Sequence, residues 1–337
     1  MSAEKVIEVS GLTKRFDVQL KRPGLWGTIE GLFRPKHRSV VAVDEVSLNV
    51  NEGETVAFIG PNGAGKSTTI KMLTGILHPT DGEVRVAGCV PWAERIELAY
   101  KIGCVFGQRS QLWYHLPAID SFEVLGRIFE LPSNKVSERI RELSELLELS
   151  SFLDAPVRKL SLGQRMRCEV AAALLHEPSI LFLDEPTIGL DVIAKRKIRE
   201  LIAKLNREEK TTIFLTSHDA TDIEHLCRRV IVVNDGRIVL DTPVKELKRR
   251  YLRTKLVGVR FSEEPQRLVL GPGLSVLKRK GPGFKFQVDT FVMTIGRALS
   301  LIAQAGKLLD ITVMDPPLEQ IIATIYEGEE VRRCVNT

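Results

Sequence analysis

The sequence is poor in cysteine, and its few cysteines form no recognisable pattern. There are five in 337 residues, at positions 89, 104, 168, 227 and 334. They are scattered, odd in number and without C-x-x-C spacing, whereas zinc sites and disulfide frameworks need closely spaced or paired cysteines. We therefore expect neither kind of site, and such thiol usage suits a reducing cytoplasm.

Long apolar runs are also missing. No run approaches the roughly 18 apolar residues that a membrane-spanning helix requires. Residues 1–6 lack the apolar stretch of a signal peptide. If the protein works at a membrane, we expect another chain to cross that membrane.

Charge of one sign is not in large excess. Lys and Arg number 48 against 43 Asp and Glu, so the formal net charge is +5. This mild basicity does not by itself indicate nucleic acid, and it is equally compatible with a membrane surface or a protein partner. Hydrophobic residues make up 44% of the chain. Composition and length together predict one large globular domain with a true core, plus a smaller one.

What the sequence does contain is a glycine-rich stretch that fits the pattern G-x-x-x-x-G-K-[ST]. It reads Gly60-Pro61-Asn62-Gly63-Ala64-Gly65-Lys66-Ser67-Thr68. A predicted buried strand at 55–59 precedes it and a predicted helix at 69–74 follows it, as this motif requires. Its glycines let the backbone bend around phosphates, Lys66 can reach the β- and γ-phosphates, and Ser67 can hold Mg²⁺. The stretch therefore predicts a nucleoside triphosphate site.

An acidic pair follows a second apolar strand. The strand predicted at 180–183 ends in Asp184 and Glu185. A carboxylate at the end of a buried strand is how P-loop enzymes fix Mg²⁺, which is the role we expect for Asp184. The next carboxylate, Glu185, is placed to orient or deprotonate an attacking water.

Three other polar residues stand at a predicted helix start or after a predicted strand. Ser161 is predicted to cap a helix at 165–175, where its hydroxyl and the free backbone amides suit a γ-phosphate. Gln108 follows an apolar strand predicted at 102–106, and His218 follows one predicted at 212–216. Taken alone, each of the three is also compatible with a purely structural role.

In this order, these features resemble the ATP-binding subunits of ABC transporters. The resemblance rests on the P-loop, Gln108, residues 161–164, Asp184-Glu185, Asp191 and His218, and it covers about residues 4–245. It implies an α/β fold, with a P-loop NTPase (RecA-like) core, an antiparallel β subdomain and a helical subdomain near 109–175. Residues 1–245 would form this ATP-binding domain, and residues 246–337 a small α+β accessory module of unreadable function.

The resemblance also implies a head-to-tail dimer that holds ATP and Mg²⁺ between two subunits. Ser161, Gly163 and Gln164 would meet the ATP held by the P-loop of the partner, and Asp191 would bridge the subunits. Phe16 would stack on adenine.

The resemblance further implies that Glu185 is the general base and that His218 is the γ-phosphate switch. Gln108 would touch both Mg²⁺ and the attacking water, and Asp184 would bind the metal together with Ser67.

Three departures from the family pattern stand out. Leu162 replaces the usual second glycine of the signature, and Phe16 stands where tyrosine is common. Residues 17–39 interrupt the strand pattern and insert a basic, partly amphipathic segment, so Trp26 or Phe33 competes with Phe16 for the adenine. The insertion suits either a helix packed on its own domain or a contact with membrane headgroups.

Residues 108–118 are unusually polar and aromatic, and they resemble the viologen, multidrug and polysaccharide export subgroup. In ABC transporters this stretch lines a groove that receives a coupling helix, although Trp113 and Tyr114 also suit plain packing. Residues 315–322 resemble the tail of such exporters. We expect an ATP-hydrolysing exporter motor, a homodimer on the cytoplasmic face of the cell membrane, with a separate permease and no nucleic acid. The alternatives are an importer ATPase and a soluble ABC ATPase acting on ribosomes or nucleic acid.

Overall fold

The computed structural model describes residues 4–19, 37–107, 110–217, 219–251, 254–265, 268, 270–315 and 325. The chain divides into two compact units, Met1–Thr242 and Pro243–Thr337. Gln108, His218, Trp26 and Phe33 lie outside the described residues, as do residues 316–322 of the exporter-like tail.

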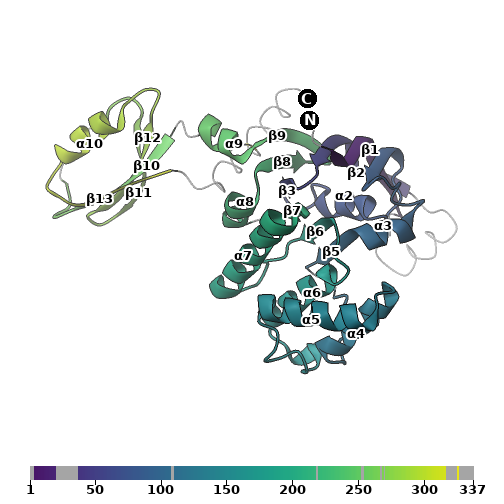
Figure 1. Ribbon diagram of the computed structural model, residues 1–337. Coiled ribbons are helices and arrows are strands. Elements are labelled where there is room, and N and C mark those ends of the chain that lie inside the picture. The colour runs from purple at the N-terminus through teal and green to yellow at the C-terminus, as the bar shows by residue number, and fades with distance from the viewer. Residues whose placement is uncertain are drawn as a thin grey trace, which may run out of the picture. The chain divides into compact units, whose positions relative to one another are not determined.

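The larger unit is built on a six-stranded sheet (Figure 1). Four of its strands are short apolar runs whose side chains are buried on both faces, as expected for parallel strands covered by helices. In spatial order the strands are β5 (Ile102–Phe106), β6 (Ile180–Asp184), β7 (Thr212–Thr216), β3 (Thr55–Ile59), β8 (Arg229–Asn234) and β9 (Arg237–Pro243). The pairs among β5, β6, β7, β3 and β8 are parallel.

A three-stranded antiparallel sheet forms the second layer. Its order is β2 (His37–Asn51), β1 (Lys5–Gln19) and β4 (Asp81–Val86). The expected interruption from 17 to 39 is wrong at both ends, because β1 and β2 stay paired out to Gln19 and His37. Val18, in the missed end of β1, is 47% exposed, so this part of the ribbon lacks the buried face that marks a strand in sequence.

Helix α2 (Lys66–Leu73) lies between the two layers and contacts β2, β4 and β6. The core of the unit fills the same space. Side chains of both sheets form one hydrophobic cluster there. The centroid of the Phe214 ring on β7 lies 5.3 Å from that of Phe58 on β3 and 5.7 Å from that of Phe182 on β6. The P-loop helix is therefore held by apolar packing on both sides.

The other helices of this unit fall into two groups, apart from α3 (Arg95–Lys101), which leads into β5. One group packs together beyond β5 and comprises α4 (Ala118–Ile128), α5 (Ser133–Leu147) and α6 (Leu162–Leu174), with a 3₁₀ turn η1 (Val157–Lys159) before α6 (Figure 1). The second pairs α7 (Val192–Glu209) with α8 (Ala220–Leu226). Within the described residues, no helix combines the length and hydropathy needed to span a bilayer.

The smaller unit has its own sheet and core. It begins with α9 (Val244–Tyr251), and its sheet runs β11 (Leu274–Lys280), β12 (Gly283–Asp289), β10 (Thr254–Phe261) and β13 (Leu308–Met314). Helix α10 (Ile295–Ala303) contributes to the core that covers one sheet face. It begins at Ile295, because Thr294 caps it by accepting a hydrogen bond from the backbone of Arg297.

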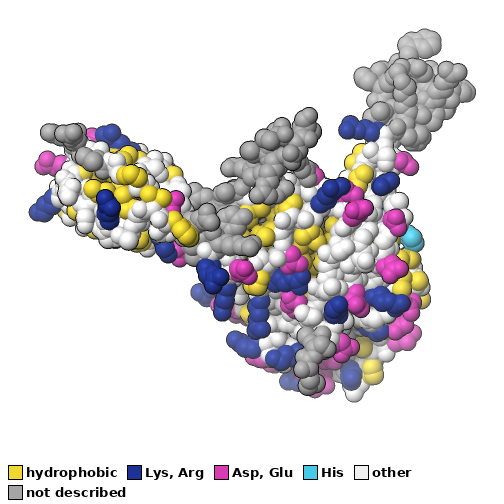
Figure 2. Space-filling view, turned by 90° about the horizontal axis from the view of Figure 1, so that it is seen from above, with side chains coloured by type: hydrophobic (Ala, Val, Ile, Leu, Met, Phe, Trp, Pro, Cys, Tyr) yellow, Lys and Arg dark blue, Asp and Glu magenta, His cyan; other side chains and the backbone are white. Residues whose placement is uncertain are grey.

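On the face seen in Figure 2, basic and acidic side chains are mixed over the larger unit. No broad field of one sign covers that face, in keeping with the small net charge.

Candidate functional site

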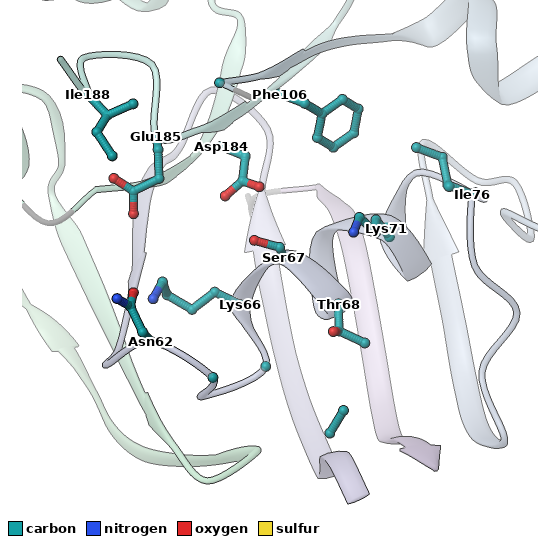
Figure 3. A pocket seen from close by; sticks show the side chains of 14 residues that line it. Asn62, Lys66, Ser67, Thr68, Lys71, Ile76, Phe106, Asp184, Glu185 and Ile188 are labelled. Carbon is teal, nitrogen blue, oxygen red and sulfur yellow. The ribbon is translucent and has the colours of Figure 1, made fainter. Parts of the chain in front are cut away.

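A pocket of about 480 Å³ opens where β3, β5 and β6 end (Figure 3). The carboxyl ends of parallel strands are where open α/β sheets place their ligand sites. Its wall combines the glycine-rich loop with residues that follow the other two strands. The lining residues are Ala42, Asn62, Gly63, Gly65, Lys66, Ser67, Thr68, Lys71, Ile76, Phe106, Gly107, Asp184, Glu185 and Ile188.

The loop after β3 requires glycine at two positions. Gly65 has φ 96°, and a Cβ there would lie 2.3 Å from the carbonyl oxygen of Ala42. A Cβ at Gly60 would lie 2.4 Å from the carbonyl oxygen of Val233. Neither contact is tolerable, so the loop can pass this close to β2 and β8 only without side chains.

Lys66 is the cation of this loop. It is 7% exposed, and its Nζ donates hydrogen bonds to the carbonyl oxygens of Gly60 at 2.6 Å and Pro61 at 3.1 Å. Burial lowers the pKa of Lys66, and the nearby Glu185 and Asp184 carboxylates oppose that shift. No described side chain caps α2, and its first residues line the pocket, so its first backbone amides are available to a ligand beside this ammonium. This set of donors fits a nucleotide's phosphates.

Asp184 and Ser67 face each other across the pocket (Figure 3). Thr216 Oγ1 donates to Asp184 Oδ1 at 2.6 Å, which fixes one oxygen and leaves the carboxylate directed at the pocket. A carboxylate and a hydroxyl beside phosphate oxygens are ligands that Mg²⁺ prefers, so the two residues fit a magnesium ion.

Glu185 enters the same pocket on a strained backbone (Figure 3). Its φ is +58°, in the left-handed region that non-glycine residues rarely adopt. Its backbone N–H donates to Thr216, at 3.2 Å to the carbonyl and 3.1 Å to Oγ1. These bonds hold the residue in a conformation that costs of order 1 kcal/mol, and such strain is typical of functional sites.

The buried carboxylate of Asp222 connects the segment after Glu185 with residues that flank position 218. Asp222 is 0% exposed and accepts hydrogen bonds from Thr187 Oγ1 at 2.5 Å, Ser217 Oγ at 2.8 Å and Arg199 Nε at 2.5 Å. Arg199 also bonds Asp219 at 3.2 Å. The residues just after Glu185 and those flanking position 218 are thereby joined through one side chain. Sequence reading missed Asp222, since an acidic residue on a short helix carries no signal of burial.

Ser161 caps α6 as predicted, and with more than a single bond. Its Oγ accepts from the backbone of Gln164 at 3.2 Å, while the Gln164 side chain accepts from the backbone of Ser161 at 2.9 Å. This is a reciprocal capping box. Neither residue lines the pocket, and Gly163 does not line it either.

Asp191 and Phe16 also lie outside the pocket lining. Asp191 caps α7 by accepting from the backbones of Ile193 and Ala194, both at 2.9 Å. Phe16 lies on β1, where its ring takes a contact from Lys14 Nζ at 5.3 Å from the centroid. One chain thus brings together the P-loop, Asp184 and Glu185, whereas Phe16, Asp191 and residues 161, 163 and 164 do not line the pocket.

The pocket also contains residues that sequence reasoning missed. Lys71 adds a second cation one helical turn after Ser67, which the i, i+4 spacing could have revealed. Ala42, Ile76 and Phe106 add apolar surface, and Ile76 is 53% exposed. Ala42 could not have been found from sequence, because it lies at the pocket only once the two sheets pack together.

Comparisons with known proteins agree with this geometry. The family model described as "ABC transporter" matches residues 43–188. The chain is 34% identical over 207 residues to the ABC transporter ATP-binding protein NatA of Bacillus subtilis (strain 168). This alignment covers 61% of this chain and 84% of the relative. It is 36% identical over 249 residues to the Nod factor export ATP-binding protein I of Cupriavidus metallidurans, covering 74% and 82%.

The fold agrees as well. The dimeric structure of a post-hydrolysis state of the ATP-binding cassette MJ0796, bound to ADP and Pi, superposes with a TM-score of 0.59 at 29% identity. It covers 71% of this chain and 98% of that one. The predicted P-loop NTPase fold is confirmed. Because the likeness extends far beyond the phosphate-binding loop, the chain belongs to the family of ABC transporter ATP-binding proteins and is an ATPase of that family.

Proposed function

We propose that this chain is the motor subunit of an ABC exporter. Two copies close head to tail around ATP, hydrolysis reopens them, and a separate permease at the cytoplasmic face of the membrane converts the motion into export. One observation carries the proposal: the pocket holds the groups for phosphate and Mg²⁺, whereas Ser161, Gly163, Gln164 and Asp191 do not line it. Those residues are then available to the nucleotide of a second copy.

Within this proposal each pocket residue has a task. Lys66 and the amides of α2 bind the phosphates, and Ser67 with Asp184 holds Mg²⁺. Glu185 accepts the proton of the attacking water. Gln108 and His218 keep the roles that the sequence resemblance implies, as Mg²⁺ contact and γ-phosphate switch.

We assign residues 1–245 to the ATP-binding domain, about 109–175 to its helical subdomain and 246–337 to the accessory module. The boundary between the two compact units, at Thr242 and Pro243, supports this division. Adenine stacking by Phe16 remains part of the proposal, with the ring supplied by β1 beside the insertion.

Two observations favour a membrane partner and export. Trp113 and Tyr114 are 41% and 53% exposed, which suits a docking surface better than core packing. Among the relatives, one is named for Nod factor export and another, from Bacillus licheniformis, for bacitracin transport.

The test is Glu185→Gln in the full-length chain. ATP should still bind, since the P-loop is untouched, while turnover should fall at least about 100-fold, the scale of a lost general base. The ATP-bound variant should elute as a dimer in light-scattering chromatography, and the nucleotide-free variant as a monomer. Glu208→Gln, on the exposed side of α7, is the matched control and should behave as wild type. Near-normal turnover of Glu185→Gln would refute the assignment of the base, and a monomer at saturating ATP would refute the sandwich.

A further inference from the structure

Helix α6 carries a carboxylate in its buried part. Glu169 is 5% exposed, although glutamate is rarely buried unless it is paired. Within the described residues it makes no ion pair. Its partners are instead Ser110, whose Oγ donates to Oε1, and the backbone N–H of Gln111, which donates to Oε2 at 3.1 Å. The Gln111 side chain returns a bond from Nε2 to the backbone carbonyl of Glu169 at 2.9 Å.

Burial of this side chain is unfavourable in itself. Desolvation raises the pKa of Glu169, and the hydrogen bonds from Ser110 and Gln111 partly reverse that shift. An apolar residue would fill the same space on α6 without this cost. The carboxylate therefore needs an explanation other than packing, and its two donors, both from one short segment, indicate what that is.

That segment connects the nucleotide pocket with the helical group. It begins after β5, where the backbone N–H of Gly107 donates to the carbonyl of Asp184 at 2.9 Å. It ends at Trp113, whose backbone N–H donates to Ser121 Oγ on α4 at 3.1 Å. Between these two anchors, the α6 side chain that bonds residues 110 and 111 in the described part of the chain is Glu169.

We propose that Glu169 is a positioning residue that couples two ATP-contacting surfaces of one chain, the segment after β5 and the start of α6. The inference rests on the proposed function, in which Gln108 serves the chain's own nucleotide and Ser161 serves the nucleotide of the partner. Glu169 lies eight residues after Ser161 on one rigid helix, about 12 Å away at 1.5 Å per residue. Any shift of α6 must carry residues 110 and 111 with it or break the bonds to Glu169.

The test compares Glu169→Ala with Glu169→Gln in the full-length chain. Alanine removes both acceptor oxygens. Glutamine keeps both contacts, because its amide oxygen accepts from the Gln111 N–H and its NH₂ donates to Ser110 Oγ. We expect Ala to lower kcat about 10-fold or more, with an ATP dissociation constant within about threefold of wild type, and Gln to stay within about threefold in both. Glu142→Ala, which removes a half-exposed partner of Arg139 on α5, is the control and should change neither.

A local readout separates positioning from general stability. Hydrogen exchange of the 110–113 amides should speed up in Glu169→Ala while α6 itself stays protected. Ser110→Ala removes one donor without touching α6; it should lower kcat less than Glu169→Ala, and the two changes should be non-additive in a double-mutant cycle. If Glu169→Ala does not fold, Ser110→Ala still tests the coupling.

Two results would overturn the coupling. One is a kcat within about twofold of wild type in both Glu169→Ala and Ser110→Ala. The other is a parallel loss of kcat, ATP affinity and unfolding midpoint without faster exchange at 110–113, which is what a merely structural residue gives. Wild-type turnover and the ATP-trapped dimer of Glu185→Gln are measured first. If these fail, the motor proposal is wrong; if they hold and Glu169→Ala is normal, only the coupling is wrong.

Discussion

Replacing Asp222 by alanine should be the most damaging single change outside the pocket. The substitution removes the acceptor of three hydrogen bonds, from Thr187, Ser217 and Arg199. The Arg199 side chain is only 15% exposed, and after the substitution its carboxylate partner is Asp219, at 3.2 Å. Breaking a buried ion pair from one side costs about 3–5 kcal/mol. Because Asp219 still compensates part of the charge, we expect about 3 kcal/mol.

The assay is urea unfolding followed by tryptophan fluorescence. The three tryptophans stand at positions 26, 92 and 113, so Pro243–Thr337 has none and the signal carries no contribution from the smaller unit. A lower midpoint at unchanged slope gives the loss of unfolding free energy. Glu208→Ala is the control, since its pair with Lys204 is 3.8 Å long and exposed on both sides, and it should cost at most about 0.5 kcal/mol.

A loss below about 1 kcal/mol for Asp222→Ala would refute the reasoning, because even ordinary hydrogen bonds contribute that much. A second arm tests the cause. Adding Arg199→Met to Asp222→Ala should recover part of the loss, since it removes the cation left unpaired. A further loss of similar size would show that Arg199 is stabilised mainly by Asp219.

Three further outcomes can be checked. Ser161→Arg should abolish turnover but spare ATP binding by the isolated chain. Mixing this variant with Lys66→Ala subunits should restore some activity, because each mixed dimer contains one intact site. Failure to restore any activity would count against the head-to-tail dimer. In a Cys334→Ser background, Cys104 and Cys168 should resist iodoacetamide at pH 8 until urea unfolds the chain, because burial raises the pKa of both thiols to about 12; prompt labelling of either in the native protein would contradict this. The pKa of Glu169 is raised above its ordinary 4.5, so its stabilising contribution is present at low pH and lost as pH rises through the folded value. Glu169→Gln should therefore gain in urea midpoint over wild type between pH 4 and 8, and a constant difference would argue otherwise.

The elements predictable from sequence were those specified by local pattern. The core strands at 55–59, 102–106, 180–183 and 212–216 are apolar runs followed by polar residues, and all four are confirmed. The cap at Ser161 is confirmed because side chain and helix start are neighbours in the chain.

What escaped prediction depends on contacts between distant segments. Ala42 reaches the pocket only because β2 packs beside the P-loop, and Asp222 becomes buried only when α7 and α8 meet. Glu169 did carry a signal, a charged residue beside the apolar run 170–175, but its partners come from a segment almost 60 positions earlier. Local periodicity has no means of pairing such positions.

The backbone at Glu185 has a consequence for the evolution of this chain. At φ +58° glycine is the most favourable residue, so Glu185→Gly should stabilise the fold by up to about 1 kcal/mol while removing the carboxylate. A library selected for folding or thermostability alone would drift toward glycine at this position and lose hydrolysis. A glutamate that persists there under such selection would record the demand for turnover rather than for structure.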